Sequence, residues 1–239
     1  MAGHSKWANI KHRKGAQDKK KGKIFTKLIK EITISSRLFG GDLDSNPRLR
    51  KAVSDAKSNN LPLDKIERAI KKGIGELDGI ENSEIIYEGF GPYGIAIMLI
   101  VITDNKNRSV AEIRHIFSKH DGNLSENGSV SWMFKKKGQI TLIGYQSNED
   151  AILDCALKFG LEDFERYNDD LILLTSPENL IVARDKLQDQ GFTIESAEIE
   201  MFSNSTQKLE IKKGERIINL LTELENHEDV NKVYTNFVV

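Results

Sequence analysis

The chain has 239 residues, of which 38% are hydrophobic and 30% are charged, and its formal net charge is −1. This length and composition are typical of two or three folded domains with ordinary apolar cores, and they exclude a wholly disordered chain. The single cysteine excludes an intramolecular disulfide and a thiolate metal cluster, and it indicates a reducing compartment. The longest apolar run, residues 95–102, is too short to cross a bilayer, and no apolar signal-peptide core follows the basic start. We therefore expect a cytoplasmic protein with no membrane partner.

Charge is distributed unevenly along the chain. Residues 1–30 contain ten lysines and arginines against one acidic residue, Asp18. The excess continues through residue 75, where nineteen basic and seven acidic residues give +12, whereas residues 76–239 carry −13. Such a division is typical of a polyanion-binding segment joined to an acidic body.

The first 21 residues contain two large apolar side chains, Trp7 and Ile10. Burial of so few groups does not offset the entropy lost on ordering, so we expect a mobile arm in the unbound protein. Lysines and arginines alternate there with Trp7, His4 and His12, which suits phosphate neutralisation and base stacking. Nucleic acid is the favoured partner of the arm, with its own acidic body or an acidic protein as alternatives. The basic start also has some likeness to an organelle transit segment, although it is rich in lysine and interrupted by glycines.

A first amphipathic helix is expected after the arm. Apolar residues between Phe25 and Ile32 recur at the spacing of one helix face, and Gly40 and Gly41 end the helix. Because helices of this length are unstable alone in water, it should pack against the helices that follow it.

Two further helices complete a predicted three-helix bundle. Asn46 can cap the second helix with Pro47 in its first position, and Pro62 begins a third helix that ends at Gly73. The third helix carries a basic stripe that is either a solvated surface or a second binding surface: Lys65, Arg68 and Lys72.

Strands and helices alternate in the acidic part of the chain. Residues 138–202 have the order strand, helix, two-stranded hairpin, helix, strand, which is the βαββαβ order of ferredoxin-like sandwiches. The flanking segments contribute βαβ and αβ, and they complete the same order if the first unit is inserted in their central hairpin. Their expected elements are strands at 84–88, 94–103 and 129–134, a helix at 109–119, and a last helix and strand at 213–225 and 232–238.

These patterns predict an α+β protein with three domains. A basic arm and three-helix bundle occupy residues 1–75, and two ferredoxin-like α/β sandwich domains follow. One of these is discontinuous, over residues 76–136 plus 208–239, and the other is inserted in it over residues 137–207.

No combination of residues indicates catalysis. The run Gly89–Gly94 matches G-x-G-x-x-G, but a strand follows it where a dinucleotide site needs a helix, so it is interpreted as a loop or hairpin turn. His115 and His120 are five residues apart, which does not place both imidazoles on one helix face for zinc. Cys155 lies among apolar residues at helical spacing and is interpreted as a core residue. We predict a protein that is not an enzyme and that has no metal, cofactor or small-molecule substrate.

Two further features fit either a binding role or a purely structural role. Lys106 and Arg108 lie at the start of a helix, where anions are favoured, and Arg114 follows on the same helix; ordinary capping of that helix is the alternative. Val130, Trp132 and Phe134 alternate on the strand expected there, and such a stripe either stacks bases or, more commonly, faces a core.

Several blocks of the chain are recognisable in order along its length. They are MAGHSKWANIKHRKGAQDKKKGKIFTKLIKEI, NPRLRKAVSDAKSNNLPLDKIERAIKKG, YEGFGP, TDNKNRSVAEIRHIFSK, GSVSWMF and the terminal VYTNF. Together they resemble the YebC family, which includes PmpR-type regulators and the mitochondrial translational activator of cytochrome c oxidase. The match covers nearly the whole chain and is strongest in residues 1–136.

The resemblance implies a three-domain α/β protein that is described both as a DNA-binding transcriptional regulator and as a ribosome-associated, RNA-binding translation factor that relieves stalling at proline runs. We expect a regulator of gene expression that binds DNA, with the ribosomal role as the alternative. By motif position, the resemblance places contacts at Lys6, Trp7, Lys11, His12, Arg13, Lys14, Arg108 and Arg114. The charge of the arm and first helix adds Lys19, Lys20, Lys21, Lys23 and Lys27.

Overall fold

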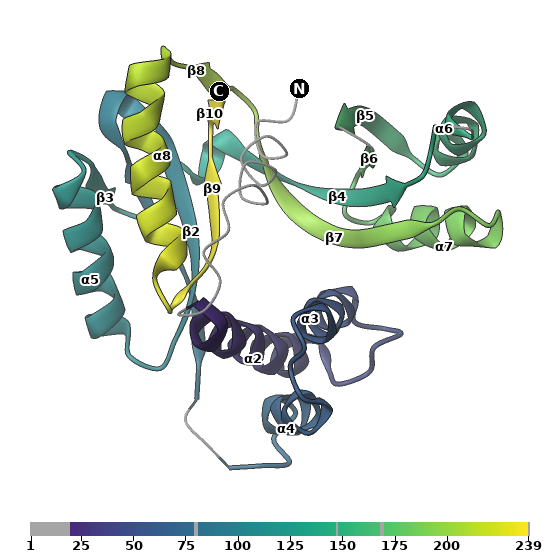
Figure 1. The fold of residues 1–239 in the computed structure, drawn as a ribbon, viewed down its shortest axis with the longest axis horizontal. Helices are drawn as coiled ribbons and strands as arrows, with labels where there is room; N and C mark the ends of the chain where they lie inside the picture. Colours follow the sequence, from purple (N-terminus) through teal and green to yellow (C-terminus); the bar gives the residue numbers. More distant parts are fainter. Residues whose placement is uncertain (1–19, 79–80, 147, 168–169, 239) are drawn as a thin grey trace.

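The computed structural model describes residues 20–78, 81–146, 148–167 and 170–238. Figure 1 shows three groups of elements: a set of helices, and two four-stranded sheets that are each covered by helices. Within these ranges no helix combines the length and apolar character that a bilayer-spanning segment needs. The mixed helix and sheet class agrees with the prediction.

Helices α2 (Lys20–Phe39), α3 (Pro47–Ser58) and α4 (Leu63–Gly73) form the first group. Asn46 caps α3 as predicted, since its side-chain oxygen accepts the Leu49 N–H at 3.0 Å. The Asn46 amide also donates to the carbonyls of Ser35 and Gly40, at 3.0 and 2.7 Å, and so binds the end of α2. The shared core consists of Ile32, Leu49, Ala52, Val53, Ala56, Leu61, Ile66 and Ala69.

The first sheet contains four antiparallel strands in the order β3-β1-β2-β9. They are β1 (Ser83–Phe90), β2 (Ala96–Thr103), β3 (Asn123–Ser125) and β9 (Val230–Thr235). Helices α5 (Lys106–Lys119) and α8 (Ile211–Asn226) cover one face of this sheet (Figure 1). The β1–β2 connection passes through a short 3-10 helix, η1 (Pro92–Gly94), so the glycine-rich run is a hairpin turn, as predicted.

Two details of this sheet differ from the expectation. Its central strands are β1 and β2, whereas the ferredoxin-like order places the first and third strands of the domain at the centre. The expected strand at 129–134 is wrong, because Ser131–Met133 form a 3-10 helix, η2. The carboxylate of Glu88 binds backbone N–H groups of this loop, which favours a turn over strand pairing. Accordingly, Val130 and Phe134 are buried but Trp132 is 71% exposed.

The second sheet confirms the predicted βαββαβ unit. Its order is β5-β6-β4-β7, with α6 (Glu149–Lys158) and α7 (Leu180–Asp189) packed on one face. All neighbouring strands are antiparallel. The strands are β4 (Phe134–Ile143), β5 (Leu161–Tyr167), β6 (Asp170–Thr175) and β7 (Ile194–Ser203).

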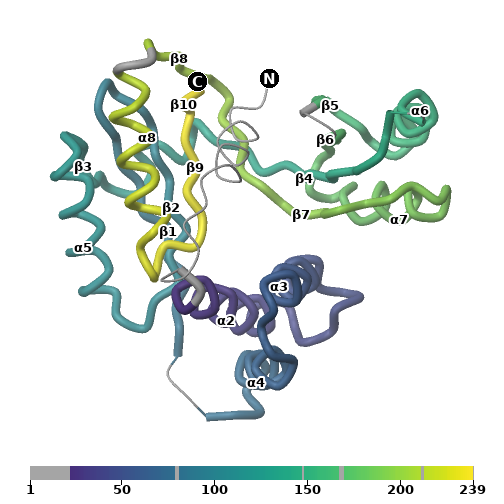
Figure 2. The backbone as a smooth tube through the Cα atoms, in the orientation of Figure 1, coloured from purple at the N-terminus to yellow at the C-terminus, as the bar shows by residue number. Residues whose placement is uncertain are grey.

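The two sheets are joined by long strands. Figure 2 follows the chain out of the first sheet through β4 and back through β7 and β8 (Gln207–Lys208), which pairs in parallel with β10 (Phe237–Val238). Phe134 and Met201 pack against Ala96 and Met98, on the face of the first sheet away from α5 and α8. From this topology we propose residues 137–207 as a domain inserted between two parts, 76–136 and 208–239.

Candidate nucleic-acid interface

Much of the predicted interface lies in the arm. Lys20 and Lys21 begin α2, which places the arm directly before a helix of the bundle. The arm residues predicted to contact nucleic acid lie outside the described residues: Lys6, Trp7, Lys11, His12, Arg13, Lys14 and Lys19.

The lysines of α2 serve two different purposes. Lys23 is exposed, as a contact with a polyanion requires. Lys27 donates to the carbonyls of Glu225 and Val230, at 2.5 and 2.7 Å, at the end of α8 and the start of β9. Its ammonium therefore holds α2 against the first sheet.

A second internal contact joins α2 to the same region. Lys30 Nζ lies 2.5 Å from Asp229 Oδ1, and the Asp229 side chain is fully buried. Arg108 lies 3.3 Å from the Asp229 carboxylate and 3.0 Å from that of Asp104. The Ser109 hydroxyl donates to the Asp229 carboxylate at 2.6 Å. Burial opposes ionisation, but hydrogen bonds from Lys30, Ser109 and Arg108 outweigh it and lower the pKa of Asp229 to about 2.

Arg108 is thus placed mainly by internal ion pairs. Asn105 caps α5 by accepting the Arg108 N–H at 3.1 Å, which is the ordinary capping alternative. Arg114 is exposed on the same helix, and so is Lys106. Neither of these two forms an ion pair with another described residue, so both are available to an anion.

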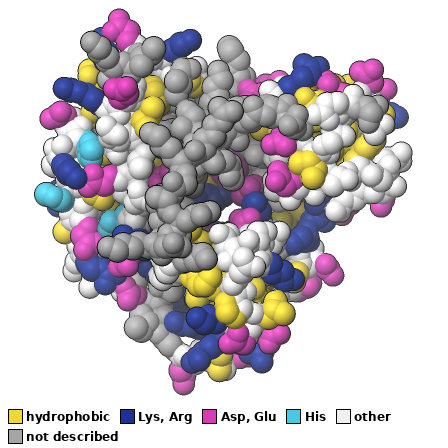
Figure 3. Space-filling view, in the orientation of Figure 1, with side chains coloured by type: hydrophobic (Ala, Val, Ile, Leu, Met, Phe, Trp, Pro, Cys, Tyr) yellow, Lys and Arg dark blue, Asp and Glu magenta, His cyan; other side chains and the backbone are white. Residues whose placement is uncertain are grey.

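The third helix presents a group of cations that we call the α4 cations: Lys65, Arg68, Lys71 and Lys72. Lys65, Arg68 and Lys71 are exposed, and Lys72 is half-buried. None of the four has an ion-pair partner within the described ranges. Figure 3 shows Lys and Arg side chains at the lower end of the molecule, where Figure 1 places α4, with acidic side chains among them. The α4 cations extend the basic character of the arm onto a folded surface.

A cluster of ionisable groups lies where the helices and both sheets meet. This junction cluster consists of Lys51 on α3, Glu198 and Glu200 on β7, and Lys232 and Tyr234 on β9. Lys232 Nζ pairs with Glu198 at 3.1 Å and with Glu200, and the Tyr234 hydroxyl donates to Glu200 at 2.7 Å. Lys51 lies 4.0 Å from Glu198. The side chains of Lys232, Glu198 and Glu200 are 16–32% exposed, so solvent screens their charges only partly.

The protonation of the junction cluster follows from its packing. Burial and the neighbouring Glu200 raise the pKa of Glu198, whereas Lys232 and Tyr234 lower the pKa of Glu200 against the effect of burial. Burial works against the charge of Lys232, but the two carboxylates raise its pKa well above the usual value. Sequence reasoning missed this cluster. Its signal is the alternation of ionisable residues at two-residue spacing on two predicted strands.

Three potential metal ligands also lie close together. Atoms of Glu112, His227 and Asp229 are within 4.8 Å of one another. His227 Nε2 lies 2.9 Å from Glu112, and His227 Nδ1 accepts the Asp229 N–H at 3.1 Å. Because the Asp229 carboxylate already binds Lys30 and Arg108, two cations face the position that a metal ion would take. The contacts account for this group as an internal hydrogen-bond network.

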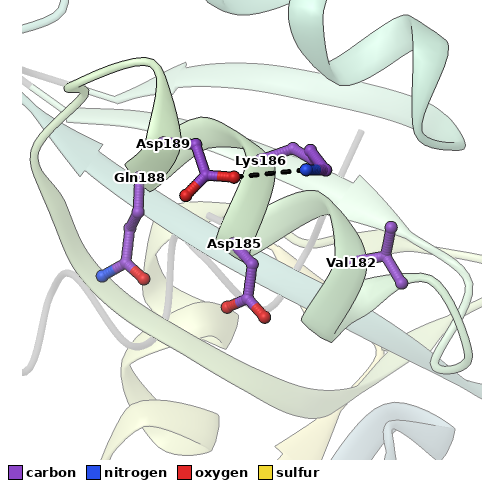
Figure 4. Close-up of a pocket in the computed structure, with 5 residues that line it drawn as sticks. All are labelled: Val182, Asp185, Lys186, Gln188 and Asp189. Carbon is purple, nitrogen blue, oxygen red and sulfur yellow. Dashed lines mark hydrogen bonds and ion pairs between the residues drawn. The ribbon is translucent and has the colours of Figure 1, made fainter.

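A surface hollow on α7 offers no reactive combination of side chains. Figure 4 shows its lining, in which Lys186 and Asp189 form an ion pair at 3.2 Å. The lining residues come from one helix: Val182, Asp185, Lys186, Gln188 and Asp189. A charged, exposed helix face of this kind is an ordinary protein surface.

Two family models together match nearly the whole chain. Residues 5–76 match the family described as the TACO1/YebC protein N-terminal domain, and residues 82–237 match the TACO1/YebC second and third domain. The chain belongs to the TACO1/YebC family. The resemblance predicted from the sequence is thereby confirmed.

Relatives in the TACO1/YebC family match over nearly their full length. A probable transcriptional regulatory protein of Desulforapulum autotrophicum is 48% identical over 99% of this chain and 96% of its own. One of Desulfosudis oleivorans, also named a probable transcriptional regulatory protein, is 50% identical with the same coverage. The crystal structure of a conserved hypothetical protein from Aquifex aeolicus is similar with a TM-score of 0.84 and 43% identity, covering 97% of this chain and 96% of that one.

Proposed function

We propose that this protein is a cytoplasmic, nucleic-acid-binding regulator of gene expression that acts through DNA and is not an enzyme. The observation that carries the proposal is the charge division, +12 over residues 1–75 and −13 over residues 76–239. The α4 cations support it, because three of them are exposed and cations without an ion-pair partner are free to neutralise phosphates. The names of the relatives, which are probable transcriptional regulatory proteins, agree with this role.

The folded part of the basic segment fixes the position of the helix that follows the arm. Lys27 and Lys30 fasten α2 to the end of α8 and the start of β9. The arm therefore leaves a helix whose position is fixed relative to both the α4 cations and the first sheet. In this proposal the arm and α4 bind phosphates, while the acidic sheets limit the orientations in which a nucleic acid can approach.

A second candidate is an RNA-binding factor that acts on the ribosome. The acidic body favours it, because a charge of −13 over residues 76–239 repels the phosphates of a long duplex that passes beside it. A structured RNA assembly that also contains basic proteins would accept both the basic and the acidic surfaces. The two candidates share the arm and differ in the partner.

Deletion of residues 2–19 tests both candidates. We expect affinity for duplex DNA and for structured RNA at physiological salt to fall at least about tenfold, because the charge of the arm is removed. Far-ultraviolet circular dichroism and thermal unfolding should match the full chain, since the deletion removes no described core residue. Unchanged affinity at the same salt would contradict the proposal.

The partner itself is identified in cells. Tagged full-length protein is sedimented with ribosomes, and DNA is recovered from parallel cultures after crosslinking. Discrete DNA fragments with protein free of ribosomes establish the DNA regulator. Ribosome association that disappears with residues 2–19 establishes the second candidate.

A further inference from the structure

The loop between β3 and β4 is held by a buried carboxylate. Glu88 on β1 is 3% exposed. Its two oxygens accept backbone N–H groups from Gly128 at 2.8 Å, Val130 at 2.6 Å and Ser131 at 2.8 Å. Burial would raise the pKa of Glu88, but these hydrogen bonds outweigh it and lower the pKa. The loop is therefore fixed by charge-assisted hydrogen bonds to a central strand.

Contacts from Asn204, directly after β7, hold the next part of the same loop. The Asn204 N–H donates to the Met133 carbonyl at 2.8 Å, and the Asn204 side-chain amide donates to the Trp132 carbonyl at 3.3 Å. Val130 and Phe134, on either side of η2, are buried in the contact between the two sheets. The backbone of Trp132 is consequently fixed on both sides.

On this fixed backbone the Trp132 side chain points into solvent. It is 71% exposed, more than any other large apolar side chain among the described residues. Its indole N–H donates to the Ser129 carbonyl at 3.1 Å, which sets the orientation of the ring. An exposed ring with a satisfied N–H offers its aromatic surface and no free donor, so it suits stacking rather than reading of base edges.

Positive charge lies beside this ring in the chain. Lys135 and Lys136 follow Phe134, the first residue of β4, and both are exposed. Because consecutive strand residues point to opposite faces, their side chains leave β4 on opposite sides. Among the described residues neither forms an ion pair, whereas Lys137 pairs with Glu162 at 3.4 Å. An exposed aromatic ring followed closely in the chain by an unpaired cation is a combination with which proteins bind single-stranded nucleic acid, the ring stacking on a base and the cation contacting a phosphate.

We propose that Trp132 is a stacking site for an unpaired base of a single-stranded nucleic acid, with one of the two lysines that follow it, Lys135 and Lys136, binding an adjacent phosphate. This inference rests on the proposed nucleic-acid function and adds a second contact region, distant in the chain from the arm. Because the indole N–H is occupied, the site accepts any base and is tolerant of sequence. Duplex DNA presents no unpaired base and gains nothing from it.

The test uses labelled oligonucleotides and four full-length proteins: wild type, Trp132→Ala, Trp132→Phe and Phe39→Ala. Phe39 is the matched control, since it is an aromatic residue, 61% exposed, at the end of α2. The probes are a single-stranded RNA of about 12 nucleotides, the DNA strand of the same sequence, and the blunt duplex of that DNA. Binding is measured by fluorescence anisotropy at one physiological salt concentration.

We expect Trp132→Ala to weaken binding of single strands between about five- and a hundredfold, the range for removal of one stacked base. Trp132→Phe should retain most of the affinity, because an aromatic ring remains. Duplex binding, and the behaviour of Phe39→Ala with every probe, should match the wild type. The RNA and DNA strands show whether the sugar contributes.

A spectroscopic readout supports the assignment. The chain has two tryptophans, Trp7 and Trp132, so a Trp7→Phe variant makes Trp132 the sole indole reporter. Its fluorescence should be quenched by saturating single strands and unchanged by the duplex. Quenching that fails to appear while the strand is bound would overturn the stacking site.

The outcomes separate this inference from the proposed function. If the wild type binds no probe, the proposed function fails and the stacking site fails with it. If the wild type binds single strands and Trp132→Ala binds them equally well, the stacking site alone is wrong. If Trp132→Ala binds oligonucleotides as the wild type does but no longer sediments with ribosomes, the ring contacts a protein. That result would also overturn the stacking site.

Discussion

The ammonium of Lys30 lies 2.5 Å from the carboxylate of Asp229, although the two residues are 199 positions apart in the chain. The pair joins the helix that follows the basic arm to the residue directly before β9, an edge strand of the first sheet. It lies beside Arg108 and Ser109, so one buried carboxylate holds two helices and a strand together. Cations that a charge count assigns to nucleic acid are here part of the scaffold.

Replacement of Asp229 should destabilise the protein at neutral pH. In Asp229→Asn the ammonium of Lys30 loses its buried partner, and we expect the free energy of unfolding to fall by roughly 3 kcal/mol. Asp104→Asn is the control: it removes the exposed partner of Arg108 and should cost less than about 1 kcal/mol. Urea unfolding at pH 7 measures both, and equal stability of Asp229→Asn and the wild type would contradict the assignment.

The same carboxylate predicts a pH dependence. The pKa of Asp229 is about 2 in the folded protein against 3.8 for an unperturbed aspartate. A group with a lowered folded pKa stabilises the fold above its unfolded pKa and loses that contribution as the pH falls through the folded value. The stability difference between wild type and Asp229→Asn should therefore be constant above about pH 5 and shrink between about pH 4 and pH 2. A difference that grows on acidification would refute it.

Lys232 should be needed to hold the junction cluster together. Lys232→Met leaves Glu198 and Glu200 side by side without their cation, and we expect the free energy of unfolding to fall by about 3 kcal/mol at pH 7. Lowering the pH to about 5 should recover part of this stability, since one of two adjacent carboxylates then binds a proton. Adding Glu198→Gln and Glu200→Gln to the variant should restore stability at neutral pH. Thermal unfolding at both pH values checks the series, and the absence of recovery in the triple variant would be inconsistent with a charge effect.

The crossing of α2 and α4 should tolerate no side chain at Gly73. A Cβ placed there would lie 2.5 Å from the Thr33 carbonyl oxygen and 2.6 Å from Ser36 Cβ. Gly73→Ala should therefore separate the helices and cost about 1–3 kcal/mol. Gly22→Ala on α2 is the matched control, because nothing lies within 4 Å of its Cβ and alanine favours the helix by up to about 1 kcal/mol. Opposite signs for the two variants in denaturant unfolding are the expected result.

The α4 cations should contribute to the salt dependence of nucleic-acid binding. In Lys65→Gln/Lys72→Gln the slope of log affinity against log salt should decrease by about one for each phosphate that is no longer neutralised. Lys158→Gln/Lys208→Gln removes the same charge from α6 and β8 and should leave the slope nearly unchanged. Anisotropy titrations over a series of salt concentrations distinguish a binding surface from net charge, since equal effects of the two variants would indicate net charge alone.

Glu88 should control the order of the loop that carries Trp132. Glu88→Gln replaces one of the two acceptor oxygens by a donor, which then faces a backbone N–H. We expect faster hydrogen exchange at one or more of the amides that bind this carboxylate, those of Gly128, Val130 and Ser131, and a decrease of about 1–3 kcal/mol in the free energy of unfolding. Amides of the second sheet, such as those of β6, serve as the internal control. Unchanged exchange at all three loop amides would show that other contacts hold the loop.

Local features of the sequence determined most elements correctly. The Asn46 cap, the glycines after α2, and the hairpin turn at Pro92–Gly94 are all properties of a few neighbouring residues. The strand order of the second sheet was also predictable, since its alternation of strands and helices is complete within one continuous segment. In each case the interactions that decide the structure are close in sequence.

Only the tertiary structure decided which cations are free and which ring is exposed. Lys27 and Lys30 belong to the basic segment that the charge count assigns to a binding surface. Their partners, however, are about 200 residues away, at the end of α8 and the start of β9. The exposure of Trp132 depends on hydrogen bonds to Glu88, some forty positions earlier. Hydrogen bonds and ion pairs between distant segments leave no periodic signal in the chain. These contacts decide where the charged groups lie, because a buried carboxylate is stable only where the fold places hydrogen-bond donors around it.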